Sequence, residues 1–151
     1  MRRLFWLFIF SCLTAAGCEN HHPNPVTFYP PASEIFAGET GQLVNPDDER
    51  VPVLLGRSID DYTQGWTAYV AGRTDLVRPL QDRKKIRWVK AKTPVRVVMT
   101  EDRLGQVFLL VRGGRHPGGS SNLLEGPDGW WTDARFFQIT VGPKVGNHKN
   151  S

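Results

Sequence analysis

Cysteine is almost absent from this chain of 151 residues, and the two that occur, Cys12 and Cys18, both lie in its first eighteen positions. No disulfide can therefore join two residues that follow Cys18, and a zinc site built on cysteine is excluded there as well. A domain in that part of the chain has to be stabilised by packing alone.

Histidine is scarce too, and only His116 of the four lies in sequence that we expect to fold. A serine–histidine–aspartate set can be drawn from His116 with Ser120 and Asp128. His116 and Ser120 lie in a glycine-rich stretch, 113–121, and Asp128 follows it in the same loop region, which lacks the rigid support that such catalysis requires. We therefore expect a protein that is not an enzyme and holds no cofactor or metal, with a small hydrolase that uses His116 as an alternative.

Long hydrophobic runs are missing as well. The longest, Leu4–Leu13, has about half of the ~20 residues that a helix needs to span a bilayer. It follows the positively charged pair Arg2-Arg3 and precedes the small residues Thr14–Gly17. This order is typical of a secretory signal peptide and predicts that residues 1–17 are a leader.

The segment Leu13–Cys18 (LTAAGC) resembles the lipobox of bacterial lipoproteins. In that family the cysteine that matches Cys18 carries acyl chains such as palmitate and becomes the first residue of the mature protein. Ala16 and Gly17 fit the pattern, whereas Ala15 stands where leucine is usual. The resemblance implies a lipid anchor on Cys18 and a place in the cell envelope, on the inner or outer membrane facing the periplasm. The alternative is a soluble, secreted protein.

Charge of one sign is not concentrated anywhere in the chain. Lysine and arginine number 19 against 15 acidic residues, and the leader removes two of the basic ones. The one basic cluster is Arg83-Lys84-Lys85 with Arg87, which is typical of a solvated surface. It lacks the extent of a surface that follows the phosphates of a nucleic acid, so we expect no nucleic-acid partner.

After the leader, residues 18–50 read as a tether and an irregular lead-in with one short strand. Four prolines fall within residues 19–31 without a hydrophobic period, which is typical of an extended tether. The next region, 51–84, reads as helical.

In this helical region, Ser58 stands where a helix N-cap would, before apolar residues that share one helical face. Gly72 ends that helix, and Pro79 either limits a second helix to about two turns or kinks it. The residues expected on the buried face of the first helix are Ile59, Tyr62, Trp66, Tyr69 and Val70.

From Lys85 onward the hydrophobic period changes to two, which is typical of strands. Strands are expected at 86–90, 93–100, 106–112 and 134–141, with a turn at 101–105. The fold class is therefore mainly β with a short N-terminal helical region. The strands occupy 85–141, and 142–151 form a flexible tail.

The pattern from Lys92 to Asp133 resembles a bacterial Src-homology-3-like barrel. The pieces that match are Thr93–Val97, Gln106–Arg112, the glycine-rich loop 113–119, and Gly129-Trp130. The second tryptophan of the pair and the inserted residues 121–127 depart from the usual spacing. The resemblance implies a small β-barrel over 85–141 that acts as a non-catalytic binding module.

Such modules in the envelope bind peptides or wall polymers, and aromatic side chains suit both ligands. The candidate ligand-binding residues are Trp88, Phe108, Trp130 and Trp131. Adjacent residues of a strand point to opposite faces, so either Trp130 or Trp131 is expected to be exposed unless helices cover it. As an alternative, the protein is a structural subunit of an envelope complex, in which a protein partner covers these aromatic residues.

The anchor can be tested with Cys18→Ser in a diderm bacterium. The wild type is expected to lose the leader, gain the mass of acyl chains and follow the detergent phase, because each buried CH₂ contributes ~0.8 kcal/mol to membrane binding. The variant should lack the acyl mass and stay in the aqueous phase. Intact mass and detergent partitioning measure both, and a soluble wild type of unmodified mass contradicts the anchor.

Overall fold

The computed structural model describes residues 26–114, 124 and 128–141. The leader, Cys18, His116 and the tail 142–151 lie outside the described residues. Neither of the described α-helices is long and apolar enough to cross a membrane.

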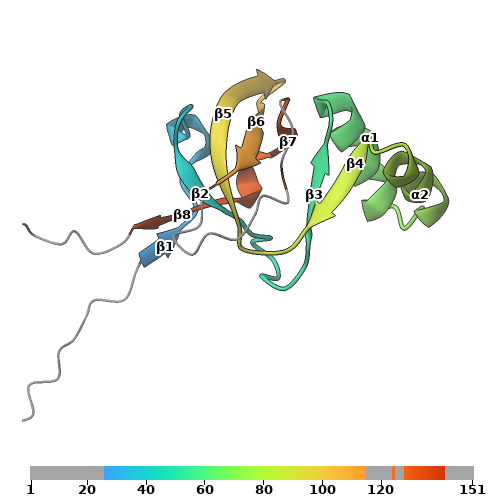
Figure 1. Cartoon of the computed structure of the whole chain (residues 1–151), viewed down its shortest axis with the longest axis horizontal. Helices are drawn as coiled ribbons and strands as arrows, with labels where there is room; N and C mark the ends of the chain where they lie inside the picture. Colours follow the sequence, from blue (N-terminus) through green and yellow to red (C-terminus); the bar gives the residue numbers. More distant parts are fainter. Residues whose placement is uncertain (1–25, 115–123, 125–127, 142–151) are drawn as a thin grey trace, which may run out of the picture.

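The described chain forms an eight-stranded antiparallel sheet with two α-helices at one end (Figure 1). The order of the strands is β1-β8-β2-β5-β6-β7-β3-β4. Their bounds are β1 Val26–Phe28, β2 Thr40–Leu43, β3 Val53–Gly56, β4 Ile86–Val89, β5 Thr93–Arg103, β6 Gln106–Gly113, β7 Trp130–Asp133 and β8 Phe137–Val141. The helices α1 (Ile59–Val70) and α2 (Thr74–Asp82) lie beside β3 and β4 in Figure 1.

The sheet is open within the described residues, which corrects the expectation of a small closed Src-homology-3-like barrel. Strands β1 and β4 end the sheet on opposite sides. The expected barrel used only strands from 85–141, but β2 and β3 come from earlier segments. Strand β4 pairs with β3 instead of with its neighbour in sequence, β5, and the sheet therefore extends where a barrel would close.

The N-terminus of α1 confirms the sequence prediction. The Ser58 side chain accepts a hydrogen bond from the Asp61 amide at 3.0 Å, which satisfies a donor that has no partner within the helix. Gly72 follows the helix with φ +69°, a conformation that glycine adopts at little cost. Pro79 lies inside α2, which has only nine residues.

The buried face of α1 differs from the prediction. Ile59 and Tyr62 are buried, but the next buried positions are Gly65 and Ala68, and Tyr69 is 44% exposed. Small residues mark the line of closest approach, because they let the helix backbone come near the sheet. A hydrophobic pattern that counts large side chains misses this line.

The closest approach is at Gly56 in β3. A Cβ at this position would lie 2.6 Å from both Cα and Cβ of Tyr62, closer than atoms can come without a shift. Around this contact the core joins α1 to residues of every described strand except β1. Its largest fully buried side chains include Tyr62, Phe137, Leu43, Leu54, Leu55, Ile86 and Leu109.

A β-bulge changes the predicted alternation of β5. Val95 and Val97 are buried as expected, but Met99 is 45% exposed. The register between β5 and β6 shifts between Val97 and Met99, which inserts one residue and reverses the faces beyond it. The turn that follows is shorter than predicted, because only Leu104 and Gly105 connect the two strands.

Two further segments differ from the sequence prediction. The expected tether of residues 19–31 contains β1, which pairs with β8 from Val26↔Val141 to Phe28↔Ile139. The expected strand 134–141 begins instead with a 3-10 turn, Ala134–Phe136. The Asp133 carboxylate starts that turn by accepting a hydrogen bond from the Arg135 amide at 2.9 Å.

Adding one methyl group at Gly56 should destabilise the fold strongly. Gly56→Ala forces α1 away from β3, and we expect a loss of about 3 kcal/mol in the free energy of unfolding. Gly72→Ala is the control, because nothing lies within 4 Å of its added Cβ. We expect it to lower the free energy of unfolding by only about 1 kcal/mol, the cost of placing alanine in a left-handed conformation. Urea unfolding measures both, and equal losses would contradict the close approach.

The hairpin tip between β5 and β6 predicts a stabilising substitution. Leu104 is fully exposed with φ +56°, and Gly105 follows with φ +81°. Two positive φ values are typical of a type I′ turn, whose first position favours asparagine. Leu104→Asn should therefore raise the free energy of unfolding by about 0.5–1 kcal/mol. An unchanged or lower urea midpoint would contradict this assignment.

Candidate functional site

The four aromatic residues predicted to bind a ligand do not share one cleft. Trp88 on β4 and Trp130 on β7 line the same pocket, whereas Phe108 on β6 lines a separate groove. Trp131 is half-buried and packs against the core. Phe108 and Trp130 are only 3% and 4% exposed, so little of either ring reaches solvent.

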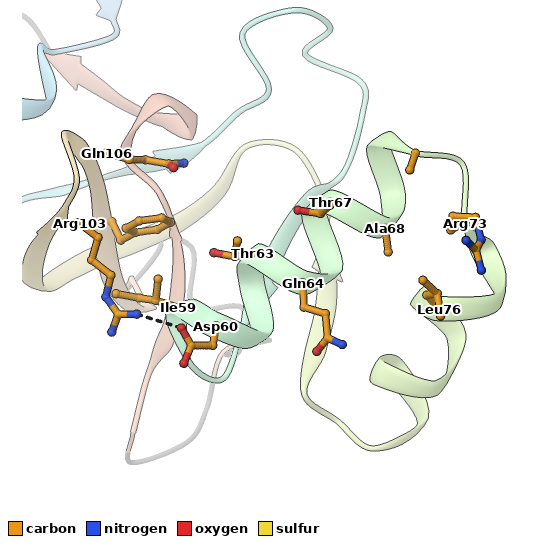
Figure 2. Close-up of a pocket in the computed structure, with 12 residues that line it drawn as sticks. Ile59, Asp60, Thr63, Gln64, Thr67, Ala68, Arg73, Leu76, Arg103 and Gln106 are labelled. Carbon is orange, nitrogen blue, oxygen red and sulfur yellow. Dashed lines mark hydrogen bonds and ion pairs between the residues drawn. The ribbon is translucent and has the colours of Figure 1, made fainter.

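The larger cavity is a groove of about 740 Å³ that we call the α1 groove. It runs between α1, the start of α2 and the β5–β6 hairpin (Figure 2). Its lining residues are Ile59, Asp60, Thr63, Gln64, Thr67, Ala68, Ala71, Arg73, Leu76, Arg103, Gln106 and Phe108.

The charges of the α1 groove are already paired. Arg103 donates to the Asp60 carboxylate at 2.9 Å, the contact drawn as a dashed line in Figure 2. Arg73 donates to both oxygens of Asp75, at 2.9 and 2.7 Å. The groove therefore presents apolar and neutral polar surface, and its charges do not select a ligand.

The second cavity, of about 460 Å³, lies at the β4 edge of the sheet, and we call it the basic–aromatic pocket. Its lining combines two tryptophans with three cationic side chains and contains no acidic residue among those described. The residues are Arg57, Gln81, Lys84, Ile86, Arg87, Trp88 and Trp130.

Strand pairing brings the cations of this pocket together. In the β3–β4 ladder Leu55 lies opposite Arg87, and the Arg57 amide donates to the Lys85 carbonyl at 2.8 Å. Since alternate residues of a strand share a face, Arg57 and Arg87 project on the same side. Gly56 pairs with Trp131 on the other side of β3, so Arg57 also lies next to Trp130.

Both guanidinium groups stack on one indole. The Cζ atoms of Arg57 and Arg87 lie 4.3 and 5.1 Å from the centroid of the Trp130 ring. Each such contact is worth about 0.5–1 kcal/mol where solvent is near. Trp130 is therefore a platform that holds two cations, which explains why its own ring is covered.

The three cations have no acidic partner among the described residues. The described ion pairs do not include Arg57, Lys84 or Arg87, whereas the adjacent Lys85 donates to Asp61 at 3.1 Å. Positive charge at this pocket is thus not neutralised by described side chains. An anionic ligand would supply the missing charge.

The titratable groups near the α1 groove are buried or hydrogen-bonded within the fold. Burial raises the pKa of Tyr62 far above its usual value of 10, and the charge of Asp133 acts in the same direction, so the phenol keeps its proton. The Asp133 carboxylate accepts a hydrogen bond from Gln106 Nε2 at 2.7 Å. In the part of the chain that the structure describes, no group of three histidine, cysteine, aspartate or glutamate residues is placed to hold a metal.

Sequence reasoning found two of the pocket's residues, Trp88 and Trp130, and missed its cations. Arg87 and Lys84 were interpreted as part of a solvated surface, and Arg57 was not singled out. No local signal identifies Arg57, because it joins the cluster only through the pairing of β3 with β4 and β7. Arg57 and Arg87 are far apart in the sequence, so the sequence alone does not show that they lie close together in the fold.

Comparisons of the chain with protein-family models, with curated proteins and with solved structures found no match.

Proposed function

We propose that this chain is a lipid-anchored protein of the cell envelope whose globular domain binds a wall polymer without catalysing a reaction. Cys18 carries the anchor, and the domain faces the periplasm. The observation that carries the binding function is the basic–aromatic pocket, which combines ring surfaces with cations that lack acidic partners among the described residues.

Partly exposed rings beside the pocket support a polymer that contains sugar rings. The Trp88 indole is half-buried, and its centroid lies 4.8 Å from that of the ring of Tyr69, a residue that is 44% exposed. Flat, rigid apolar surfaces of this kind stack on sugar rings and lose little conformational entropy. Of the aromatic candidates predicted from the sequence, Trp88 is thus the one best placed to contact a ligand ring.

The pocket's chemistry supports binding rather than hydrolysis. Its described lining offers guanidinium, ammonium, amide and indole groups, and it contains no carboxylate or imidazole that could act as a general base. The hydrolase alternative rests on His116, which lies outside the described residues. Mutating His116 without loss of function would exclude that alternative.

The predicted anchor keeps the domain close to a membrane. Eight residue steps separate Cys18 from Val26, the first described residue, and they span at most about 28 Å. A domain held at this distance can reach polymer next to the membrane. The resemblance of residues 92–133 to Src-homology-3-like modules is consistent with binding, and in the described fold it extends only to the adjacent strands β5, β6 and β7.

Sedimentation with purified cell-wall sacculi tests the proposal. A soluble Cys18→Ser protein should co-sediment with sacculi, and adding Trp88→Ala should weaken binding about fivefold, the effect of losing about 1 kcal/mol of ring stacking. Phe36→Ala, which removes an exposed aromatic ring distant in sequence from the pocket residues, is the matched control and should bind as before.

Tyr69→Ala provides a second variant if loss of Trp88 disturbs the core, because Tyr69 is more exposed than Trp88 and its ring contacts the Trp88 ring. Circular dichroism checks that each variant is folded. A Cys18→Ser protein that stays in the supernatant would overturn the wall-polymer function, and equal binding by all variants would overturn the role of this pocket.

A further inference from the structure

We infer that the basic–aromatic pocket recognises a carboxylate, which Arg57 and Arg87 bind with Lys84 as a third cation. This inference rests on the proposed function for the identity of the polymer that carries the carboxylate. The recognition chemistry itself comes from the pocket.

The cationic donors of the pocket have no side-chain acceptors among the described residues. The described side-chain hydrogen bonds include none from Arg57, Arg87 or Lys84. Stacking on Trp130 restricts the two guanidinium groups while leaving their edges, which carry the N–H groups, available. A ligand that binds them therefore loses less conformational entropy than it would on mobile arginines.

The positive charges of the pocket lie close to one another. Since both Cζ atoms lie within about 5 Å of one ring centroid, the two positive charges stand no more than about 9–10 Å apart. Like charges at this spacing repel each other, and Lys84 adds a third charge to the same cavity. A bound anion removes this repulsion and gains attraction from all three groups.

The planar shape of the guanidinium groups indicates the shape of the anion that they would bind. Guanidinium groups are planar forks whose paired N–H donors match the two oxygens of a carboxylate. The pocket, at about 460 Å³, holds such a group together with an attached ring. The Gln81 amide in the same lining can donate to or accept from the hydroxyls of that ring. The combination favours a sugar acid over a bare inorganic anion.

Glucuronate and glucose are suitable probes, because they share a ring and differ in the carboxylate. Indole N–H signals in ¹H–¹⁵N spectra of the soluble Cys18→Ser protein should shift with glucuronate and stay in place with glucose. Raising the salt concentration should weaken the glucuronate response, because screening acts on partly exposed charges. Equal responses to the two sugars would overturn the inference.

Substitutions identify the residues responsible. Arg57→Gln with Arg87→Gln should weaken glucuronate binding at least tenfold, and Lys84→Gln, at an exposed position, should weaken it by a smaller factor. Arg78→Gln is the matched control, since it removes one exposed positive charge from α2 outside this pocket. If the double variant is unfolded, Lys84→Gln alone decides: unchanged affinity overturns the role of the cations.

Two further measurements separate the possible failures. Sacculi whose carboxylates have been converted to amides should no longer bind, and retained binding would overturn the carboxylate while leaving the wall-polymer function intact. Glucuronate binding by a protein that does not bind sacculi would support the carboxylate site and overturn the wall-polymer function. Inorganic phosphate that binds more tightly than glucuronate would assign the pocket to phosphate groups and overturn the inference.

Discussion

Gly56 lies where α1 comes closest to the sheet, and the arrangement of the pocket depends on this contact. The missing side chain admits the backbone of Tyr62 against β3. Strand β3 is thereby held between β7 and β4, with Gly56 opposite both Trp131 and Ile86. Arg57 directly follows Gly56. The contact that closes the core therefore also fixes the position of Arg57, one of the three cations of the basic–aromatic pocket. Gly56 therefore links the packing of α1 to the position of Arg57 in the basic–aromatic pocket.

The cations that lack acidic partners among the described residues are explained by which acidic residues already form ion pairs elsewhere in the fold. Asp61, at the start of α1, pairs with Lys85, and Asp60 pairs with Arg103 of the hairpin. The first pair joins α1 to the residue before β4 and the second joins it to the end of β5, and the described cations at the β4 edge have no acidic partner among the described residues. Because partly exposed ion pairs contribute little to stability, such cations cost the fold little and remain available for a ligand.

Local patterns in the sequence correctly predicted the features that depend on interactions between neighbouring residues. The Ser58 cap, the glycine after α1 and the β5–β6 hairpin depend on neighbouring residues, and all three are present. The open sheet could not be predicted in this way, because β3 pairs with β4 across two helices and β7 joins them from far along the chain. The bulge before Met99 likewise has no signal in the alternation of apolar residues.

Trp130 illustrates why the candidate site was only half predictable. The reasoning that adjacent tryptophans point to opposite faces is sound, but exposure depends on what covers each face. Arg57, which directly follows β3, and Arg87 of β4 cover Trp130, so its ring contacts two cations and has little surface left for a ligand ring. Trp88, on the edge strand, has no further strand beyond it among the described residues and keeps part of its surface free. In the proposed binding mode the two tryptophans have complementary roles: Trp130 would hold the cations that bind an anion, and Trp88 would offer the surface against which the attached ring rests.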